Sequence, residues 1–239
     1  MPLANQSTSP CASCVLRSSN FCGAVLHRDG AQTEPPVRQT FSGASAGQTI
    51  YYRNEPSEDT LILCYGWAAN LVQLSDGRKQ ILSIVLAGDL ISSKLIFSNA
   101  LHFSVQALTD IRLSRVNRAD LKRRLLGDRA AIEAAAKVCL AEAKAVDDLV
   151  VDLGRRTAEE RIAHLILSLT ERIEQRSVIR DGRYPFPLRQ QDIADMLGLT
   201  PEHVSRIVGK FRNAKLFEFA GGVLQVHDAE ALERAGRLR

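Results

Sequence analysis

The sequence lacks an apolar run long enough to cross a membrane. Its longest runs, such as Leu61–Leu63 and Ile84–Ala87, fall far short of the ~20 residues that a spanning helix needs. Its N-terminus also lacks the basic, apolar and small-residue segments of a secretory signal. We therefore expect a cytoplasmic protein with no membrane partner.

Recognisable enzyme motifs are also missing. The sequence contains no glycine-rich phosphate loop, no His-Glu-x-x-His zinc motif and no serine nucleophile elbow. Its clustered cysteines have no nearby base that would make one of them a nucleophile. These absences predict a protein that is not an enzyme. A third class of protein, a metal-storage or structural interaction module, would not need residues that read DNA bases, and the C-terminal third of the sequence contains candidates for such residues.

Neither the charge nor the composition is extreme. The net charge of +4 permits a nucleic-acid partner without requiring one, because the placement of charges matters more than their sum. Hydrophobic residues make up 45% and charged residues 24% of the 239 positions, which is enough apolar material for two ordinary globular domains.

The segment from about 49 to 118 has the pattern of a small all-β domain. Short apolar runs at 61–65, 70–74 and 80–86 each stop at a turn. The dipeptide Asp76-Gly77 between two of these runs is a strong signal for a β-hairpin. Strands that recur about every ten residues favour a sandwich or a barrel.

A long helix is predicted over 120–154, which is rich in Ala, Leu, Glu and Lys and contains no proline. Apolar and small residues recur there at seven-residue spacing, and small residues let two helices approach closely. The pattern predicts a homodimer; the alternative is one amphipathic helix lying on its own domain. The predicted dimer seam consists of Ile132, Cys139, Ala143, Val146, Val150 and Leu153.

Residues 189–215 have the pattern of a helix-turn-helix. An apolar face on a first short helix ends at Gly198, which tolerates the left-handed conformation of a tight helix stop. Thr200 is placed to cap the second helix, and Pro201 suits its first position. Gly221-Gly222 follows as the turn of a hairpin, as the wing of a winged helix would. The alternative is a helical hairpin in a domain core.

The candidate DNA contacts follow from helix geometry, because the N-terminal part of the second helix enters the major groove. Glu202, Ser205 and Arg206 share the polar face of that helix. Arginine can bond guanine twice, glutamate can accept from cytosine, and serine can serve either role. Lys210 lies further along and is better placed for phosphate, which adds affinity but little sequence information. The remaining candidate DNA contacts are Thr200, Arg189 and Gln191.

The segments Gln191–Arg206 and Arg155–Ala163 closely resemble those of the Crp/Fnr superfamily of bacterial regulators. The resemblance covers nearly the whole chain. It implies an α+β fold with a β-roll sensor domain like that of cyclic-nucleotide-binding proteins, a long dimerisation helix and a C-terminal winged helix-turn-helix. The corresponding ranges are 1–40 for a cysteine arm and linker, 41–119 for the β-roll, 120–155 for the dimerisation helix and 156–239 for the DNA-binding domain.

Within this family, Glu202, Ser205 and Arg206 match the triad of the FNR/FixK type. The resemblance implies binding to double-stranded DNA at a palindrome similar to TTGAT-N4-ATCAA, and a transcription regulator that responds to oxygen or redox state. It also implies that the hairpin at Asp76-Gly77 contacts RNA polymerase, as in an activator. Cyclic AMP is not expected as a ligand. The stretch Gly88–Ser104, which corresponds to the family's phosphate-holding segment, lacks the Gly-Glu and Arg-Ser pairs used there.

Three of the five cysteines form the motif Cys11-x2-Cys14-x7-Cys22. This motif resembles the cysteine arm of the FNR-like regulators, which implies an iron–sulfur cluster of the [4Fe-4S] type held by thiolates. The fourth cysteine of that family is replaced here by Ser114. Cys64, in an earlier strand, is the possible substitute, and His27 is a weaker one.

Alternatives for the arm remain open: a zinc site, redox-reactive thiols or inert thiols. A further alternative is a FixK-like regulator without a cluster, which is controlled by its abundance or by cysteine oxidation. Cys139 on the predicted seam is expected to pack as a small apolar residue. His102, beside Phe103, is expected to be structural rather than the ligand of a bound group.

Overall fold

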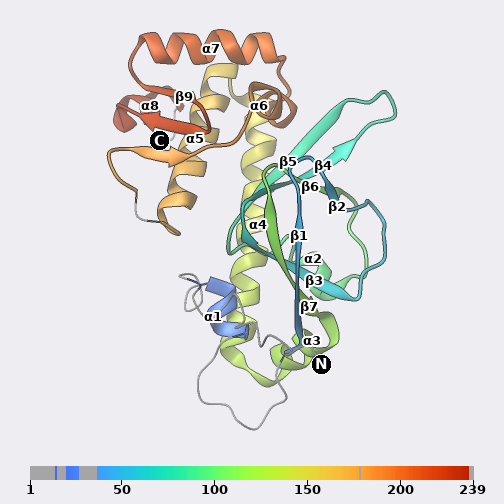
Figure 1. The fold of residues 1–239 in the computed structure, drawn as a ribbon. Coiled ribbons are helices and arrows are strands. Elements are labelled where there is room, and N and C mark those ends of the chain that lie inside the picture. The colour runs from blue at the N-terminus through green and yellow to red at the C-terminus, as the bar shows by residue number, and fades with distance from the viewer. Residues whose placement is uncertain (1–13, 15–19, 27–36, 178, 237–239) are drawn as a thin grey trace, which may run out of the picture.

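The computed structural model describes residues 14, 20–26, 37–177 and 179–236. The chain forms a β-roll (strands β1–β7 with helix α2) and a C-terminal domain (residues 158–236), and the long helix α4 runs beside both (Figure 1). In chain order the elements are α1 (Asn20–Leu26), β1 (Gln39–Ala44), β2 (Thr49–Tyr51), β3 (Asp59–Tyr65), β4 (Trp67–Gln73), β5 (Lys79–Leu86), α2 (Lys94–Phe97), β6 (Ser104–Ala107), β7 (Ile111–Asn117), α3 (Arg118–Gly127), α4 (Arg129–Arg155), α5 (Ala158–Glu174), β8 (Arg183–Pro185), α6 (Gln190–Leu197), α7 (Pro201–Asn213), β9 (Phe217–Ala220), β10 (Val223–Val226) and α8 (Ala229–Gly236).

The β-roll consists of two antiparallel sheets with strand orders β1-β7-β3 and β2-β6-β4-β5. Alternate residues of the strands point between the sheets, where Leu63, Leu113 and Val105 are buried in a common core. Strands β4 and β5 form the hairpin predicted at Asp76-Gly77. The glycine has φ of +88°, a conformation that residues with a Cβ atom rarely adopt. The predicted α+β fold class is confirmed.

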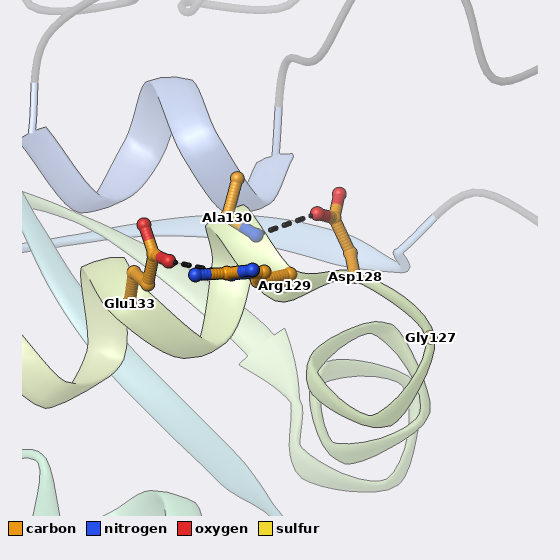
Figure 2. Close-up of a pocket in the computed structure, with 5 residues that line it drawn as sticks. All are labelled: Gly127, Asp128, Arg129, Ala130 and Glu133. Atoms are coloured by element: carbon orange, nitrogen blue, oxygen red, sulfur yellow. Dashed lines mark hydrogen bonds and ion pairs between the residues drawn. The ribbon is translucent and has the colours of Figure 1, made fainter.

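The helix expected as one unit after residue 120 is divided at Asp128 into α3 and α4. Asp128 has an extended backbone with φ of −138°, and its carboxylate accepts a 2.9 Å hydrogen bond from the amide of Ala130 (Figure 2). An aspartate in this position caps the first turn of the second helix. The shallow pocket at this junction is open to solvent, and its Arg129 and Glu133 pair with one another at 2.9 Å.

Helix α1 packs against α4 and the end of the β-roll. Its side chains Phe21 and Val25 are buried in an apolar cluster with Ile62 of β3, Leu121 of α3 and Ala131 of α4. This contact holds α1 against the long helix (Figure 1). Among the described helices, none has both the length and the apolar character needed to span a bilayer.

The C-terminal domain begins with the capping box predicted from Thr157 and Glu160, in which each side chain bonds the other residue's backbone amide. Its helices α5, α6 and α7 pack over a three-stranded sheet of order β8-β10-β9. The strands β9 and β10 form the hairpin predicted at Gly221-Gly222. The core of this domain extends without a break onto the outer face of β4 and β5 in the β-roll.

Candidate nucleic-acid interface

The turn between α6 and α7 has the predicted geometry. Helix α6 ends at Gly198, which has φ of +64° in the left-handed region. Thr200 then accepts a hydrogen bond from the amide of His203 at 3.3 Å, and Pro201 occupies the first turn of α7. The cap fixes where α7 begins, and therefore which of its side chains share a face.

Helix α7 has one buried and one exposed face. Val204, Ile207, Val208 and Phe211 are buried in the core of the C-terminal domain. Glu202, Ser205 and Arg206, the predicted base-reading triad, are all exposed. Figure 1 shows α7 at the end of the molecule opposite α3, where its outer face is accessible. The arrangement presents three hydrogen-bonding side chains of different kinds on one helical face.

Local hydrogen bonds favour the ionised form of Glu202. Bonds from its own backbone amide and from the Thr200 hydroxyl lower the pKa of the Glu202 carboxyl. A glutamate is ionised near neutral pH even without such a shift, and the ionised group acts only as an acceptor. An acceptor of this kind can recognise the amino group of cytosine but not the edge of guanine.

The other four predicted DNA contacts each have a partner within the chain. Thr200 caps α7, and the amide of Gln191 lies 2.6 Å from the carboxylate of Asp195. Arg189 pairs with Asp192 at 3.0 and 3.1 Å, a hydrogen bond that raises the pKa of the guanidinium. The ammonium of Lys210 lies 2.7 Å from Glu159. Binding phosphate through these side chains would require them to share or exchange their present partners.

Arg161 is a residue whose role the sequence did not indicate. Its guanidinium donates to three backbone carbonyls: Leu153 at 2.9 Å, Arg156 at 2.9 Å and Leu197 at 3.0 Å. Two of these lie at the C-terminal end of α4, and the third is on the last residue of α6. One side chain thus joins the long helix to the turn of the helix-turn-helix. Its partners are carbonyl groups, which every residue carries, so no side-chain pattern in the sequence marks them.

A second group at the same junction surrounds the buried carboxylate of Asp152 near the end of α4. The Nδ1 atom of His164 in α5 lies 2.9 Å from it, and the guanidinium of Arg156 also contacts it. A buried carboxylate is stable only with such partners. These contacts fix the direction in which α5 leaves α4.

The predicted dimer seam is a largely exposed stripe on α4. Val146 and Val150 are 58% and 65% exposed, and Ile132 is half exposed. Ala143 is also exposed, whereas Cys139 and Leu153 are half-buried. The opposite face of α4 is charged, as in the 2.6 Å pair of Lys144 with Asp148. An apolar stripe of this length is typical of a surface that packs on another helix.

The cysteine arm is described only in part. Cys11 and His27 lie outside the described residues, and Cys14 and Cys22 are half-buried, the latter on α1. Among the described residues, no three His, Cys, Asp or Glu side chains gather as metal ligands would.

Ser114, which occupies the position of the family's fourth cluster-binding cysteine, is buried. Ser114 lies in β7, and its hydroxyl donates to the side-chain oxygen of Gln39 at 3.3 Å. Cys64 lies at an irregularity near the end of β3. Four-thiolate ligation through position 114 therefore does not fit this chain.

The stretch 88–104 contains an internal carboxylate contact. Glu142 of α4 accepts hydrogen bonds from the amide of Ser93 at 2.7 Å and from its hydroxyl at 2.8 Å. Ser93 immediately precedes α2 and is buried.

His102, which was expected to be structural, contacts the ring of Phe103 edge-on. The pKa of the His102 imidazole is lowered by burial and by the positive charges of Lys94 and Arg53.

The tip of the β4–β5 hairpin, which is predicted to contact RNA polymerase, carries the exposed residue Asp76. Asp76 pairs with Arg78 at 2.7 Å, and half of its side-chain surface is accessible. The amide and guanidinium of Arg78 lower the pKa of the Asp76 carboxyl. The tip therefore presents a structured turn with both charges at the surface.

Comparison with known proteins gives matches over both domains. Residues 44–128 match the cyclic nucleotide-binding domain, and residues 160–235 match the Crp-like helix-turn-helix domain. The nitrogen fixation regulation protein FixK of Rhizobium meliloti is 32% identical over 71% of this chain and 74% of its own length. FixK of Bradyrhizobium diazoefficiens is 28% identical over 94% of each chain. The solved structure of FixK2 from Bradyrhizobium japonicum is 26% identical, covers 83% of this chain and 97% of that one, and superposes with a TM-score of 0.75.

Proposed function

The chain belongs to the Crp/Fnr family of DNA-binding transcription regulators, and we propose that it binds a palindrome of the form TTGAT-N4-ATCAA as a homodimer. The observation that carries the proposal is the exposed face of α7, on which Glu202, Ser205 and Arg206 stand together. Its relatives are transcription regulators rather than enzymes.

Each residue of this triad has a distinct role in the proposed complex. Arg206 donates two hydrogen bonds to a guanine, and the ionised Glu202 accepts one from the amino group of a cytosine. Ser205 can donate or accept and supports either neighbour. Lys210, near the other end of α7, is paired with Glu159, and it adds affinity rather than sequence preference only if it leaves this partner for a phosphate.

A palindrome requires two copies of α7 at a fixed separation. The exposed apolar stripe of α4, which includes Val146 and Val150, supports a parallel contact between two chains. Two helix-turn-helix units in such a dimer contact half-sites about one helical turn of DNA apart, roughly 34–36 Å. The hairpin tip at Asp76-Gly77 then remains available to RNA polymerase.

The DNA-reading assignment is tested by Arg206→Ala. Binding is measured by fluorescence anisotropy on the palindrome and on variants changed at one base pair. Loss of a bidentate contact predicts a cost of ~1–3 kcal/mol at one base pair and relaxed selectivity there. Arg234→Ala, on exposed α8, is the control. Unchanged affinity and selectivity in Arg206→Ala would show that the triad has been misassigned.

The regulating signal in this proposal is the redox state of the cysteine arm. Helix α1 supports this assignment, because Cys22 lies beside Phe21, which anchors α1 against α4. A chemical change at Cys22 therefore acts next to the dimerisation helix. A [4Fe-4S] cluster would take Cys11, Cys14 and Cys22 as thiolate ligands and a fourth ligand other than residue 114. Without a cluster, the same thiols act by direct oxidation, as in the FixK-like alternative.

Anaerobic purification separates the two forms of this proposal. An absorption band in the visible range, with iron and sulfide that are lost in air, indicates the cluster. Cys64→Ser then tests whether this thiol supplies the fourth ligand. A colourless protein whose DNA binding changes on mild oxidation, and no longer does so in Cys22→Ser, indicates thiol chemistry. DNA binding that responds to neither treatment contradicts redox control.

Cyclic nucleotide is not part of the proposed mechanism. In the segment that corresponds to the phosphate-holding stretch, the amide and hydroxyl of Ser93 already bond the carboxylate of Glu142. A phosphate brought to the same donors would meet this negative charge. Calorimetric titration with cyclic AMP should give no binding, and measurable binding would contradict this part of the proposal.

A further inference from the structure

A tight turn in the β-roll carries a carboxylate toward the C-terminal domain. Asp89 follows Gly88 at the end of β5, and the amide of Asp89 bonds the carbonyl of Leu86 at 3.0 Å. The turn is also tied to β3, because Leu63 exchanges hydrogen bonds with Gly88 at 2.7 Å and Asp89 at 2.9 Å. Asp89 therefore stands on a rigid part of the β-roll.

The carboxylate of Asp89 holds two arginines of the C-terminal domain. Arg172 of α5 donates to it at 2.8 Å and to the carbonyl of Ile84 at 2.8 Å. Arg176, just after α5, also pairs with Asp89 and donates to the carbonyl of Ala87 at 3.2 Å. We call this group the Asp89 clamp; its members are Asp89, Arg172 and Arg176. Arg172 and Arg176 are one-third exposed or less, so these charge-assisted bonds are partly shielded from water.

An apolar contact adjoins the clamp. Strand β4 is buried on both faces, and its outer face carries Trp67, Ala69 and Leu71 against the C-terminal domain. Trp67 is 8% exposed and meets the ring of Phe186 edge-on at 6.4 Å between ring centres. The side chain of Gln80 in β5 donates to the carbonyl of Met196 in α6 at 2.9 Å. The contact therefore extends to the first helix of the helix-turn-helix.

Docking in this way leaves the DNA-reading and dimer surfaces open. Helix α7 packs on α5, α6 and β9, all within its own domain. Arg206 and its two triad neighbours on α7 are exposed, as is Val146 on the dimer stripe. The docked arrangement is therefore compatible with binding DNA as a dimer.

We propose that the Asp89 clamp is a positioning device that holds each α7 at the separation set by the palindrome, an inference that rests on the proposed DNA-binding function. At the α4–α5 junction, Arg161 and the group around Asp152 hold only the near end of α5. The clamp adds a second fixed point, because it ties the far end of α5 to the β-roll. Asp89 touches no base, yet it determines which half-site spacing is bound.

The first test needs no DNA. Trp67 is the only tryptophan in the chain, so its fluorescence reports on the docked surface. In Asp89→Ala we expect its emission to shift to longer wavelength and its quenching by acrylamide to increase, with the far-ultraviolet circular dichroism unchanged. Asp110→Asn is the matched control, because its carboxylate bonds the amide of Ala46 within the β-roll. A Trp67 signal in Asp89→Ala equal to that of the wild type overturns the clamp.

The second test measures spacing. Palindromes with N3, N4, N5 and N6 spacers are compared by anisotropy. We expect Asp89→Ala to lose roughly tenfold in affinity at the spacing that the wild type prefers and to discriminate less among the four, since charge-assisted bonds are lost. Arg172→Met should behave alike, and the double variant should be less than additive because both changes break one group.

The outcomes of these tests are separable. Wild-type protein that binds none of the palindromes contradicts the proposed target, whereas the Trp67 measurement still decides the clamp. A folded Asp89→Ala dimer that keeps the wild-type spacing preference overturns the positioning role. Asp110→Asn should match the wild type in both tests.

Discussion

The ammonium group of Lys210 in α7 lies 2.7 and 2.8 Å from the two carboxylate oxygens of Glu159 in the first turn of α5. Both side chains are well exposed, so the pair contributes little to stability. The pair affects DNA binding instead, because it occupies a cation on α7. Glu159 holds the cation that α7 would otherwise offer to a phosphate, and it places a negative charge beside the same region.

Replacing Glu159 by glutamine should therefore strengthen DNA binding. Lys210 becomes available to a phosphate, and we expect the slope of log K against log salt to steepen by about 0.9 for each new contact. Anisotropy titrations at several KCl concentrations measure both the affinity and the slope. Glu230→Gln, in the exposed pair with Arg234 on α8, should change neither. Weaker binding by Glu159→Gln would contradict the competition.

An acidic residue on the α4 stripe should prevent dimerisation. Val146 is more than half exposed in the single chain, so Val146→Asp leaves the fold intact but places a charge in the proposed seam. We expect the mass measured by analytical ultracentrifugation to fall to that of one chain, with loss of palindrome binding. Lys137→Glu, an exposed change on the same helix away from the stripe, should remain dimeric. A dimeric Val146→Asp protein would exclude this seam.

Arg161→Lys should destabilise the junction between α4 and the helix-turn-helix. A lysine has no planar fork and cannot reach three carbonyls in different directions, so at least one of these partly buried acceptors loses its partner. We expect a loss of ~1–3 kcal/mol in the free energy of unfolding, measured by urea denaturation. Arg155→Lys, on an exposed neighbouring residue, should lie close to the wild type. Equal stability of the two variants would contradict the role of Arg161.

The carboxylate of Asp120 should make stability depend on acid pH. A hydrogen bond from Arg38 lowers the pKa of Asp120 from 3.8 to about 2. Because the folded-state pKa is the lower one, the stabilisation is present above about pH 4 and is lost as the pH falls through about 2. Asp120→Asn should therefore lower the urea midpoint near neutral pH, with a difference that shrinks toward pH 2. Arg38→Met should reduce the same pH dependence but not remove it, because the amide of residue 38 and the guanidinium of Arg123 still bond the carboxylate. An Asp120→Asn difference that is constant at all pH values would contradict this account.

The helix-turn-helix was predictable because its signals are local. Thr200, Pro201 and Gly198 act on the backbone within a few residues of themselves, and the predicted cap, first position and left-handed stop are all confirmed. The same holds for the capping box of α5 and the hairpins of β4–β5 and β9–β10. The division at Asp128 was missed, although an aspartate that caps the next turn is itself a local signal.

One feature of the sequence indicates that the outer face of the β-roll is covered. Strand β4, Trp67–Gln73, carries apolar residues on both faces: Trp67, Ala69 and Leu71 on one, Ala68 and Val72 on the other, with Asn70 as the polar exception among them. A strand with one face in water alternates apolar and polar residues, whereas apolar residues on both faces indicate burial on both. This pattern predicts that something covers the outer face, but it does not identify the C-terminal domain as the cover.

Most of the elements, their caps and the apolar residues of the α4 stripe follow from the sequence alone, because each depends on residues a few positions apart; the reading triad stays a prediction. The tertiary structure alone decided the contacts between distant segments: Asp89 with Arg172, Glu142 with Ser93, and Arg161 with the carbonyl of Leu197. Side chains such as these have no periodicity, and a carbonyl acceptor has no sequence signature. Only the folded chain, which brings residues dozens of positions apart to within 3 Å, shows which charged groups join the β-roll to α5.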